Sequence, residues 1–298
     1  MFKLPRNKTN SGQALILVLL GMAVVLTLVI SIVSTSVTDI DVSTRDEEAV
    51  RALNAAEAGI EQGFLVATTT SDEFPDNNSA FTATVTGVAE SSNNYNLPEN
   101  LETGETGTLW YVSHDENGLA CDAEHPCVAG AGQTLRVCFS PTGTGVSEAP
   151  AVEISFFYDE SASGVATGNF SQVKVARVAY DPNASRILNN SFTQANGGNC
   201  VDVDGQSYEF STPAIDLDSL GIGCPPGCLL FARVKPLYNT TAMPIGFISS
   251  AILPSQGVKV VSTGTSGDST RTLEAFRSYK EPPAVFDAAI FSNSGLTK

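Results

Sequence analysis

The side chains best suited to chemistry gather in one short stretch that holds both histidines of the chain. His114, Cys121, His125 and Cys127 follow the spacing His-x6-Cys-x3-His-x-Cys. Imidazole nitrogens and thiolates are ligands of zinc, but this spacing matches no usual zinc motif. A disulfide loop that carries two surface histidines explains the same residues. We therefore expect no metal centre here.

A second candidate is the segment Asp202-Val203-Asp204-Gly205, which resembles the opening of a calcium-binding loop. Ser207 or Glu209 could add an oxygen ligand, but the third acidic ligand and the bidentate glutamate at loop position twelve are missing. Asp-Gly is also a common hairpin turn, and this is the interpretation we prefer. Asp202 and Asp204 remain a weak calcium candidate, and we expect no cofactor.

Neither catalytic motifs nor a basic surface accompanies these residues. The sequence has no Gly-x-Ser-x-Gly elbow, no Walker loop and no His-Glu-x-x-His motif. Its 16 basic and 32 acidic residues give a net charge of −16, which repels the phosphates of nucleic acids. We therefore expect neither an enzyme nor a nucleic-acid-binding protein. A hydrolase whose site follows no familiar motif stays open as an alternative.

Six cysteines form a candidate disulfide framework, as is typical of proteins in oxidising compartments. Six cysteines allow 15 pairings. We prefer the local pairs Cys121–Cys127 and Cys224–Cys228, the second of which would close the turn Pro225-Pro226-Gly227. This choice leaves Cys138 to pair with Cys200.

The elements that would carry these residues begin with a basic leader peptide, residues 1–12, and an apolar segment. No charged side chain occurs from Gln13 to Thr38, and the apolar body 14–37 has 24 residues. As a helix it would be ~36 Å long, enough for a hydrocarbon core of ~30 Å. The positive charges precede the segment and the first acid, Asp39, follows it. We therefore predict a single-pass membrane protein with a cytoplasmic N-terminus and residues 39–298 outside.

Two other interpretations of this segment are a cleaved secretory signal peptide and an ordinary membrane anchor. A cleaved secretory signal peptide normally has a shorter apolar core, of about 7–15 residues. An ordinary membrane anchor with a helical stalk would explain the same sequence pattern.

The helix is expected to continue beyond the membrane to about Val66. The sequence from Asp39 to Val66 lacks proline, and its apolar residues recur at threes and fours, the period of a half-buried helix. Residues 13–66 would form one transmembrane and amphipathic rod of ~80 Å. Small side chains would let a sheet or a second helix approach closely. These candidates for helix packing are Ala55, Ala56, Gly59 and Gly63.

Beyond the rod, the pattern is that of short strands. Residues 67–107 are polar and predict a loop region with one strand or hairpin, in which only residues 81–88 alternate. From residue 108 to residue 298, apolar alternations recur every ten to twenty residues and predict a β-rich globular domain. Within it, residues 284–291 predict a last strand or short helix. The expected fold class is α+β, a long helix followed by a mostly antiparallel β domain.

The N-terminal region resembles a known family. The stretch GQALILVLLGMAVVLTLVISIVSTSV, followed by RALNAAEAGIEQGF, is similar to the N-terminal region of PilX-type minor pilins of type IV pilus systems, kin to the K-type minor pseudopilins of type II secretion. The resemblance covers roughly residues 10–66. It implies a pilin-like fold, cleavage between Gly12 and Gln13 by a prepilin peptidase, and often methylation of the new N-terminus at Gln13.

One departure from the major pilins narrows the implied role. Major pilins usually have Phe at the first mature position and Glu at the fifth, where this chain has Gln13 and Leu17. A carboxylate in lipid costs roughly 2.5–3.5 kcal/mol, so a subunit keeps it only when a partner offsets this cost. Leu17 needs no such partner, which fits a subunit at a filament tip or in an initiation complex. Leu17 therefore joins the candidates for helix packing.

The resemblance thus implies a minor pilin-like structural subunit that is displayed at the cell surface after assembly. Its partners would be other pilin or minor pilin subunits, the prepilin peptidase and the membrane. The alternative is a surface-anchored adhesin or ligand-binding module that uses a pilin-like membrane anchor.

Overall fold

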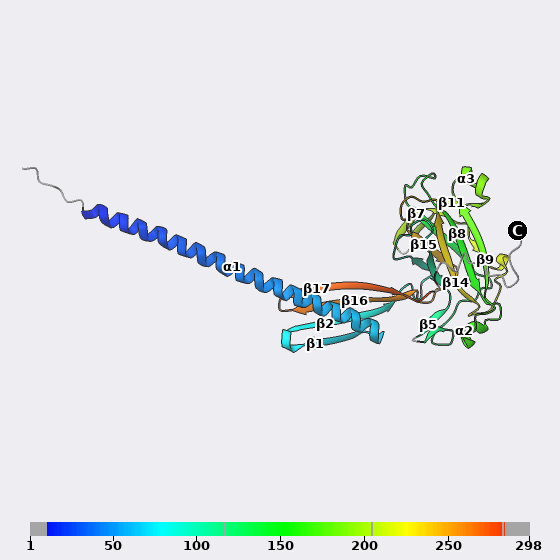
Figure 1. Cartoon of the computed structure of the whole chain (residues 1–298), viewed down its shortest axis with the longest axis horizontal. Helices are drawn as coiled ribbons and strands as arrows, with labels where there is room; N and C mark the ends of the chain where they lie inside the picture. The colour runs from blue at the N-terminus through cyan, green and yellow to red at the C-terminus, as the bar shows by residue number, and fades with distance from the viewer. Residues whose placement is uncertain (1–10, 116, 204, 282, 284–298) are drawn as a thin grey trace, which may run out of the picture. The chain divides into compact units, whose positions relative to one another are not determined.

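The computed structural model describes residues 11–115, 117–203, 205–281 and 283, without the side chains of residues 11–14, 199, 201 and 202. The chain divides into two compact units. The first unit comprises residues 1–85 and 260–275, and the second comprises residues 86–259 and 276–298. A long apolar helix is followed by a mostly antiparallel, β-rich part, which confirms the α+β class (Figure 1). Residues 284–291, where a last strand or short helix was predicted, lie outside the described residues.

Helix α1 (Ser11–Val66) is the main element of the first unit. Its 56 residues contain no proline, so every turn can form its backbone hydrogen bonds. The helix ends where Ala67 adopts a left-handed conformation, with φ of 53°. The N–H of Ala67 donates to the carbonyl of Gly63 at 3.0 Å, which satisfies one of the last free carbonyls of the helix.

A four-stranded sheet completes the first unit, in the order β1-β2-β16-β17. Strands β1 (Thr70–Phe74) and β2 (Ser79–Gly87) form an antiparallel hairpin, in the region where one strand or hairpin was expected. Between them a short 3-10 turn, Pro75–Asn77, ends at Asn78 in a left-handed conformation. Strands β16 (Gly257–Ser266) and β17 (Ser269–Ser278) come from the far end of the chain. The predicted limits 67–107 and 108–298 did not anticipate this pairing, because strands so distant in sequence share no local pattern.

The second unit contains two larger sheets. The five-stranded sheet has the order β10-β9-β8-β14-β4, in which only the short β10–β9 pair is parallel among the described pairs. The six-stranded sheet has the order β11-β12-β7-β15-β3, with β13 also paired to β7. The bounds of the first sheet are β4 (Gly107–Trp110), β8 (Ala151–Tyr158), β9 (Lys174–Asp181), β10 (Thr193–Gln194) and β14 (Leu229–Leu237). Those of the second are β3 (Asn94–Asn96), β7 (Thr134–Pro141), β11 (Asn196–Val203), β12 (Gln206–Ser211), β13 (Ile215–Asp216) and β15 (Ile245–Ser249).

Smaller elements lie between these strands. A short hairpin pairs β5 (Ser113–Asp115) with β6 (Gly118–Ala120), and there are two short helices, α2 (Ser163–Thr167) and α3 (Ala184–Asn190). A 3-10 turn spans Asp218–Leu220.

The core of the second unit lies between the two sheets. Side chains that point inward from both sheets form one buried cluster. Its large, fully buried members include Phe156 of β8 on one side, with Phe139 of β7 and Phe247 of β15 on the other. The second unit is therefore a β-sandwich, in which alternate residues of each strand face the core.

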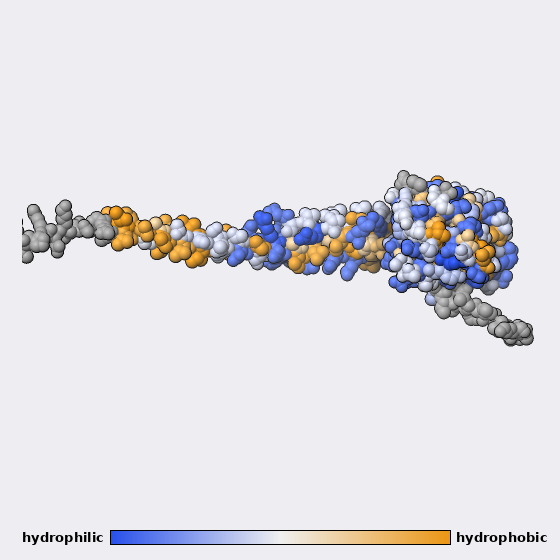
Figure 2. All heavy atoms as spheres, turned by 90° about the horizontal axis from the view of Figure 1, so that it is seen from above, coloured by the Kyte–Doolittle hydropathy of each residue, from blue (hydrophilic) through white to orange (hydrophobic). Residues whose placement is uncertain are grey.

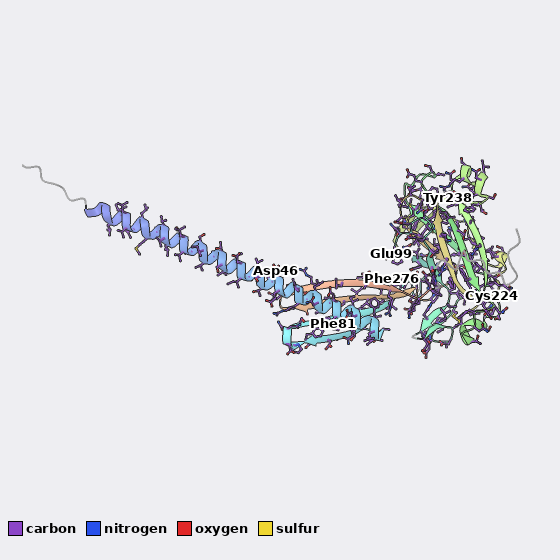
Figure 3. All side chains as sticks on the ribbon, in the orientation of Figure 1. Asp46, Phe81, Glu99, Cys224, Tyr238 and Phe276 are labelled. Atoms are coloured by element: carbon purple, nitrogen blue, oxygen red, sulfur yellow. A yellow bond between two sulfur atoms is a disulfide. The ribbon has the colours of Figure 1, made fainter. Side chains whose placement is uncertain are left out.

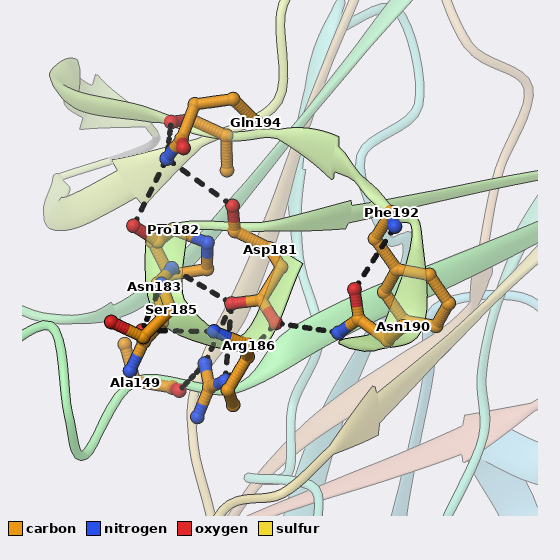
Figure 4. A network of polar contacts seen from close by, with 10 residues as sticks. Ala149, Asp181, Pro182, Asn183, Ser185, Arg186, Asn190, Phe192 and Gln194 are labelled. Carbon is orange, nitrogen blue, oxygen red and sulfur yellow. Dashed lines mark hydrogen bonds and ion pairs between the residues drawn. The ribbon is translucent and has the colours of Figure 1, made fainter. Parts of the chain in front are cut away.

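A buried ion pair fixes the loop that follows β9 (Figure 4). The carboxylate of Asp181 is fully buried and accepts hydrogen bonds from Arg186 Nη2 at 2.8 Å and from Asn190 Nδ2 at 2.9 Å. Arg186 also donates to the carbonyl of Ala149 at 2.7 Å. Burial disfavours the charged carboxylate, but the hydrogen bonds from Arg186, the Asn183 N–H and Asn190 outweigh it, so the pKa of Asp181 lies below its usual range.

Three disulfides lie in the second unit. They join Cys121 to Cys127, Cys138 to Cys200, and Cys224 to Cys228, with Cα–Cα distances of 5.4, 5.8 and 6.0 Å. These three pairs confirm the predicted pairing. The Cys138–Cys200 bond connects β7 to β11, which flank β12 in the six-stranded sheet.

Candidate functional site

The N-terminal half of α1 presents an apolar surface that the described part of the chain leaves exposed. Its most hydrophobic 18-residue window has a mean hydropathy of 3.1 and contains no buried residue. The large apolar side chains from Leu15 to Val37 are 51 to 69 % exposed, and they form the hydrophobic stretch in Figure 2. By length and composition, this helix could cross a membrane.

The C-terminal half of α1 packs on the four-stranded sheet through small residues. Ala52, Ala55 and Ala56 are buried. A Cβ on Gly59 would lie 2.6 Å from Cδ2 of Phe81, which is labelled on β2 in Figure 3. The space at Gly59 is therefore already filled by the sheet, and any larger residue would force the sheet away.

The same close approach occurs at two further positions of this interface. A Cβ on Gly63 would lie 2.7 Å from Cγ1 of Val260. On the side of the sheet, a Cβ on Gly264 would meet the backbone of Ala52 and Ala56. At Gly264 the backbone of the sheet therefore approaches the backbone of the helix so closely that only glycine fits.

Polar contacts hold the edges of this interface. The N–H of Asp268 donates to Glu48 Oε2 at 3.3 Å, across the turn between β16 and β17. Arg51 pairs with Glu47 one turn earlier in the helix and donates to the carbonyl of Asn77 at 3.4 Å. These contacts involve side chains that flank the small residues.

The residues expected to act in processing and packing fall into two groups. Gly12 and Gln13 lie in the first turn of α1, but their side chains are not among those described. Leu17 is exposed in the apolar half. Ala55, Ala56, Gly59 and Gly63, in contrast, all belong to the half that packs on the sheet.

The candidate metal ligands are separated by the fold. Cys121 and Cys127 are bonded to each other and cannot supply thiolates. His125 contacts Asp122 at 3.0 Å, whereas His114 stacks on Tyr279. Among the described residues, no group of three or more His, Cys, Asp or Glu side chains could hold a metal ion.

The calcium candidate falls partly outside the described residues. Asp204 is not described, and neither is the side chain of Asp202. Around them, Val203 of β11 pairs with Gln206 of β12, and Gly205 has a φ of 79°. This geometry is that of the two-residue hairpin turn we preferred.

A cavity of about 710 Å³ lies on the face of the five-stranded sheet opposite the sandwich core. Aromatic side chains form much of its wall, among them Trp110, Phe157, Phe231 and Tyr279. Phe157 and Phe231 stack with their ring centroids 4.4 Å apart. The cavity could not be predicted from the sequence, because its walls come from segments far apart in the chain.

Arg233 of β14 is the most unusual residue of the cavity, because it is only 2 % exposed. Its guanidinium lies 5.4 Å from the ring centroid of Phe231 and 5.8 Å from that of Phe157, in cation–π contact. Glu281 Oε2 lies 3.7 Å from Arg233 Nη2. A cation in the middle of the apolar strand LLFARVKPL was the one local signal of a polar site.

His114 adds a neutral ring to the wall. It stacks on Tyr279 at a centroid distance of 3.9 Å and meets Trp110 edge-on at 4.5 Å. Within the described chain, neither of its nitrogens makes a hydrogen bond of ordinary geometry. Burial lowers the pKa of His114 to about 4, against a smaller opposing effect of the Asp115 carboxylate.

The described chain thus offers two candidate functional surfaces, the apolar half of α1 and the aromatic cavity. Comparisons with known protein families, with curated proteins and with solved structures find no match for the chain. Its function is therefore inferred from its own residues.

Proposed function

We propose that this chain is a minor pilin-like structural subunit of a type IV pilus or a related filament, which acts in initiation or at the tip. The observation that carries the proposal is the division of α1 into two halves. The first half exposes its large apolar side chains, whereas the second half is covered by the sheet of its own unit. A helix that is apolar all round needs lipid or other helices to cover it.

Lipid would cover the apolar half of α1 first, and neighbouring helices would cover it after assembly. Before assembly, lipid surrounds the apolar half, and the cations of the leader hold the N-terminus on the cytoplasmic side. Cleavage after Gly12 removes those three cations and leaves a mature chain with 13 basic and 32 acidic residues, a net charge of −19. In the filament, van der Waals packing against neighbouring helices replaces the lipid contacts.

Leu17 supports a place at the tip or in an initiation complex. The major pilins that the sequence resembles use a glutamate at this position, which is thought to face the amino terminus of a neighbouring subunit. Leu17 is apolar and exposed, so it imposes no buried charge that a neighbour must neutralise. A subunit without that requirement can begin a filament or cap it.

The mature N-terminus tests the processing step. In cells with an active prepilin peptidase, mass spectrometry should find a chain that starts at Gln13, and in cells without the peptidase it should find the leader intact. Gly12→Leu should block cleavage, while Gly21→Leu in the same helix should leave it unchanged. An intact leader in the presence of active peptidase would overturn the proposal.

Copy number tests the place in the filament. Purified filaments should contain a few copies of the chain each, and deletion of its gene should lower the number of filaments per cell. Leu17→Glu restores the carboxylate of the major pilins and should raise the copy number, whereas Leu17→Gln should not. Absence of the chain from purified filaments would contradict a structural role.

The second candidate function is a surface-anchored adhesin or ligand-binding module on a pilin-like anchor. The aromatic cavity of the second unit favours it, because assembly does not require a cavity of this size. Under this alternative, deletion of the gene leaves filament number unchanged, and the full chain still binds a ligand. Filament counts therefore separate the two proposals.

A further inference from the structure

We propose that the aromatic cavity of the second unit binds a flat apolar ring that carries a carboxylate. The inference goes beyond the proposed function, because neither membrane insertion nor helix packing uses this cavity. All of its lining residues belong to the second unit, and they come from segments spread along that unit's sequence.

The size and walls of the cavity fit one small ligand. Its volume of about 710 Å³ lies within the range of ~300–1,000 Å³ that is usual for small-molecule sites. Phe231 and Phe157 provide stacked rings, and Phe170, which is 39 % exposed, stands at a more open part of the wall. Aromatic walls favour a flat ring, which gains both apolar burial and stacking.

The charges along the wall favour an anion. Three cations line the cavity, Arg233, Arg277 and Lys280, against one carboxylate, that of Asp115. Oδ1 of Asp115 accepts the N–H groups of Asn117 and Gly118, at 2.8 and 2.9 Å. That carboxylate is therefore already engaged within its own turn. The excess of cations around the cavity contrasts with the net charge of −16 of the whole chain.

The three cations have different roles. Arg233 is buried beside two phenylalanine rings and faces Glu281, so its charge is already balanced inside the wall. Arg277 and Lys280 are exposed residues of the same cavity and can meet a carboxylate that remains partly in water. His114 is neutral near pH 7 and offers a ring surface, without adding to the attraction for an anion.

The test uses Trp110, which is the only tryptophan of the chain and lines the cavity. The full chain in nanodiscs of zwitterionic lipid is titrated with 2-naphthoate, and with its neutral analogue 2-naphthylmethanol, while the fluorescence of Trp110 is recorded. Empty nanodiscs correct for partition of the probes into lipid. We expect saturable quenching, with 2-naphthoate about fivefold tighter, as a contribution of about 1 kcal/mol from charges at the rim implies.

Variants of the chain test which residues cause the preference for 2-naphthoate over 2-naphthylmethanol. The double variant Arg277→Gln, Lys280→Gln should bind the two probes equally well. The matched control, Lys174→Gln with Lys235→Gln, removes two cations of the same unit that do not line the cavity, and should keep the preference. Val173→Phe, on the wall, should weaken binding of both probes. Urea unfolding, followed by Trp110, establishes that each variant is folded.

Three results would overturn the inference. They are the absence of saturable quenching by either probe, equal affinity of the wild-type chain for both probes, and a preference that survives loss of Arg277 and Lys280. Filament counts do not enter this test, so its outcome is independent of the role in assembly.

Discussion

The two units bury their surfaces by opposite means. In the first unit, α1 meets its sheet through residues with little or no side chain, such as Ala52, Ala56 and Gly59. In the second unit, two sheets meet through large and fully buried side chains, such as Phe156 and Phe247. The first interface should therefore tolerate no added atoms, and the second should tolerate no lost ones.

The cross-links follow the same division. All six cysteines lie between residues 121 and 228, in the second unit. Among the described residues of the first unit, packing and polar contacts at the edges of the interface hold the helix on the sheet. This contrast predicts that a change in one unit can be detected there without a matching change in the other.

The largest effect is expected from the removal of a core side chain in the second unit. Phe156→Ala should lower the free energy of unfolding by about 4 kcal/mol, since it removes apolar contacts and leaves a cavity. Urea unfolding followed by Trp110 measures it, and Phe156→Leu should cost less, as less volume is lost. Hydrogen exchange of residues 45–66 should remain slow. Faster exchange there would contradict the independence of the two units, because it would mean that they unfold together.

The next largest effect concerns the buried ion pair. Asp181→Asn leaves the guanidinium of Arg186 without its carboxylate, and should cost about 3 kcal/mol by the same urea measurement. Glu160→Gln breaks the exposed pair with Lys174 and should lower the free energy of unfolding far less, because water and salt screen an exposed pair. Because the folded pKa of Asp181 is depressed, its contribution is complete above pH ~4 and is lost as the pH falls below that value. Similar losses for both variants would contradict a dominant buried pair.

A smaller effect is expected in the first unit, where a Gly→Ala change in a helix should lower stability instead of raising it. Gly→Ala in a helix normally stabilises by about 1 kcal/mol. Gly59→Ala should instead destabilise by about 1–3 kcal/mol, because the new methyl group would meet Ser262 and Phe81. Gly21→Ala, which has no atom within 4 Å of the new Cβ, is the matched control in the same helix. Hydrogen exchange of residues 45–66 and 260–275 should accelerate for Gly59→Ala only, while the Trp110 unfolding curve stays in place.

The smallest effect is a pH dependence of the second unit. The pKa of His114 is about 4 when folded and ~6.5 when unfolded, so the unfolded chain binds a proton first as the pH falls. Stability should therefore decrease between pH 6.5 and pH 4, by about 2 kcal/mol, which is less than the full shift in pKa would give because His114 is partly exposed. Urea midpoints at pH 7 and pH 4.5 measure this slope. His114→Gln should flatten it, whereas His125→Gln should not, because His125 contacts Asp122 and not the aromatic rings.

Much of the fold could be predicted because its signals are local. The charge-free run after Gln13 and the absence of proline predicted a helix over residues 13–66, and α1 spans Ser11–Val66. The apolar alternations after residue 108 predicted strands in this part of the chain, and β8 (Ala151–Tyr158) is one of them. The pairing of β16 and β17 with the N-terminal hairpin could not be predicted, because it depends on which distant strands meet and not on any local pattern.

Of the candidate sites, one could be predicted from the sequence and the other could not. The small residues of α1 were visible in the sequence, since Gly59 and Gly63 lie four apart on one helical face. The cavity was not, because Trp110, Phe231 and Tyr279 come from three separate segments that only the folded chain brings together. The spacing of His114 made it a candidate zinc ligand, whereas its neighbours in the structure are aromatic rings.

The sheet of the first unit also determines how mechanical force enters the second. The backbone passes between the units three times, after Val85, after Lys259 and after Ala275. These three crossings continue from β2, β16 and β17, which are neighbours in one sheet. A pull between α1 and the second unit runs covalently through the crossing after Val85, and β16 and β17 share it only through the hydrogen bonds of the sheet. A protease that cuts after Val85 would end the covalent link between α1 and the second unit, because all three disulfides lie within the second unit, and the sheet and the packing of α1 would then have to hold the two fragments together.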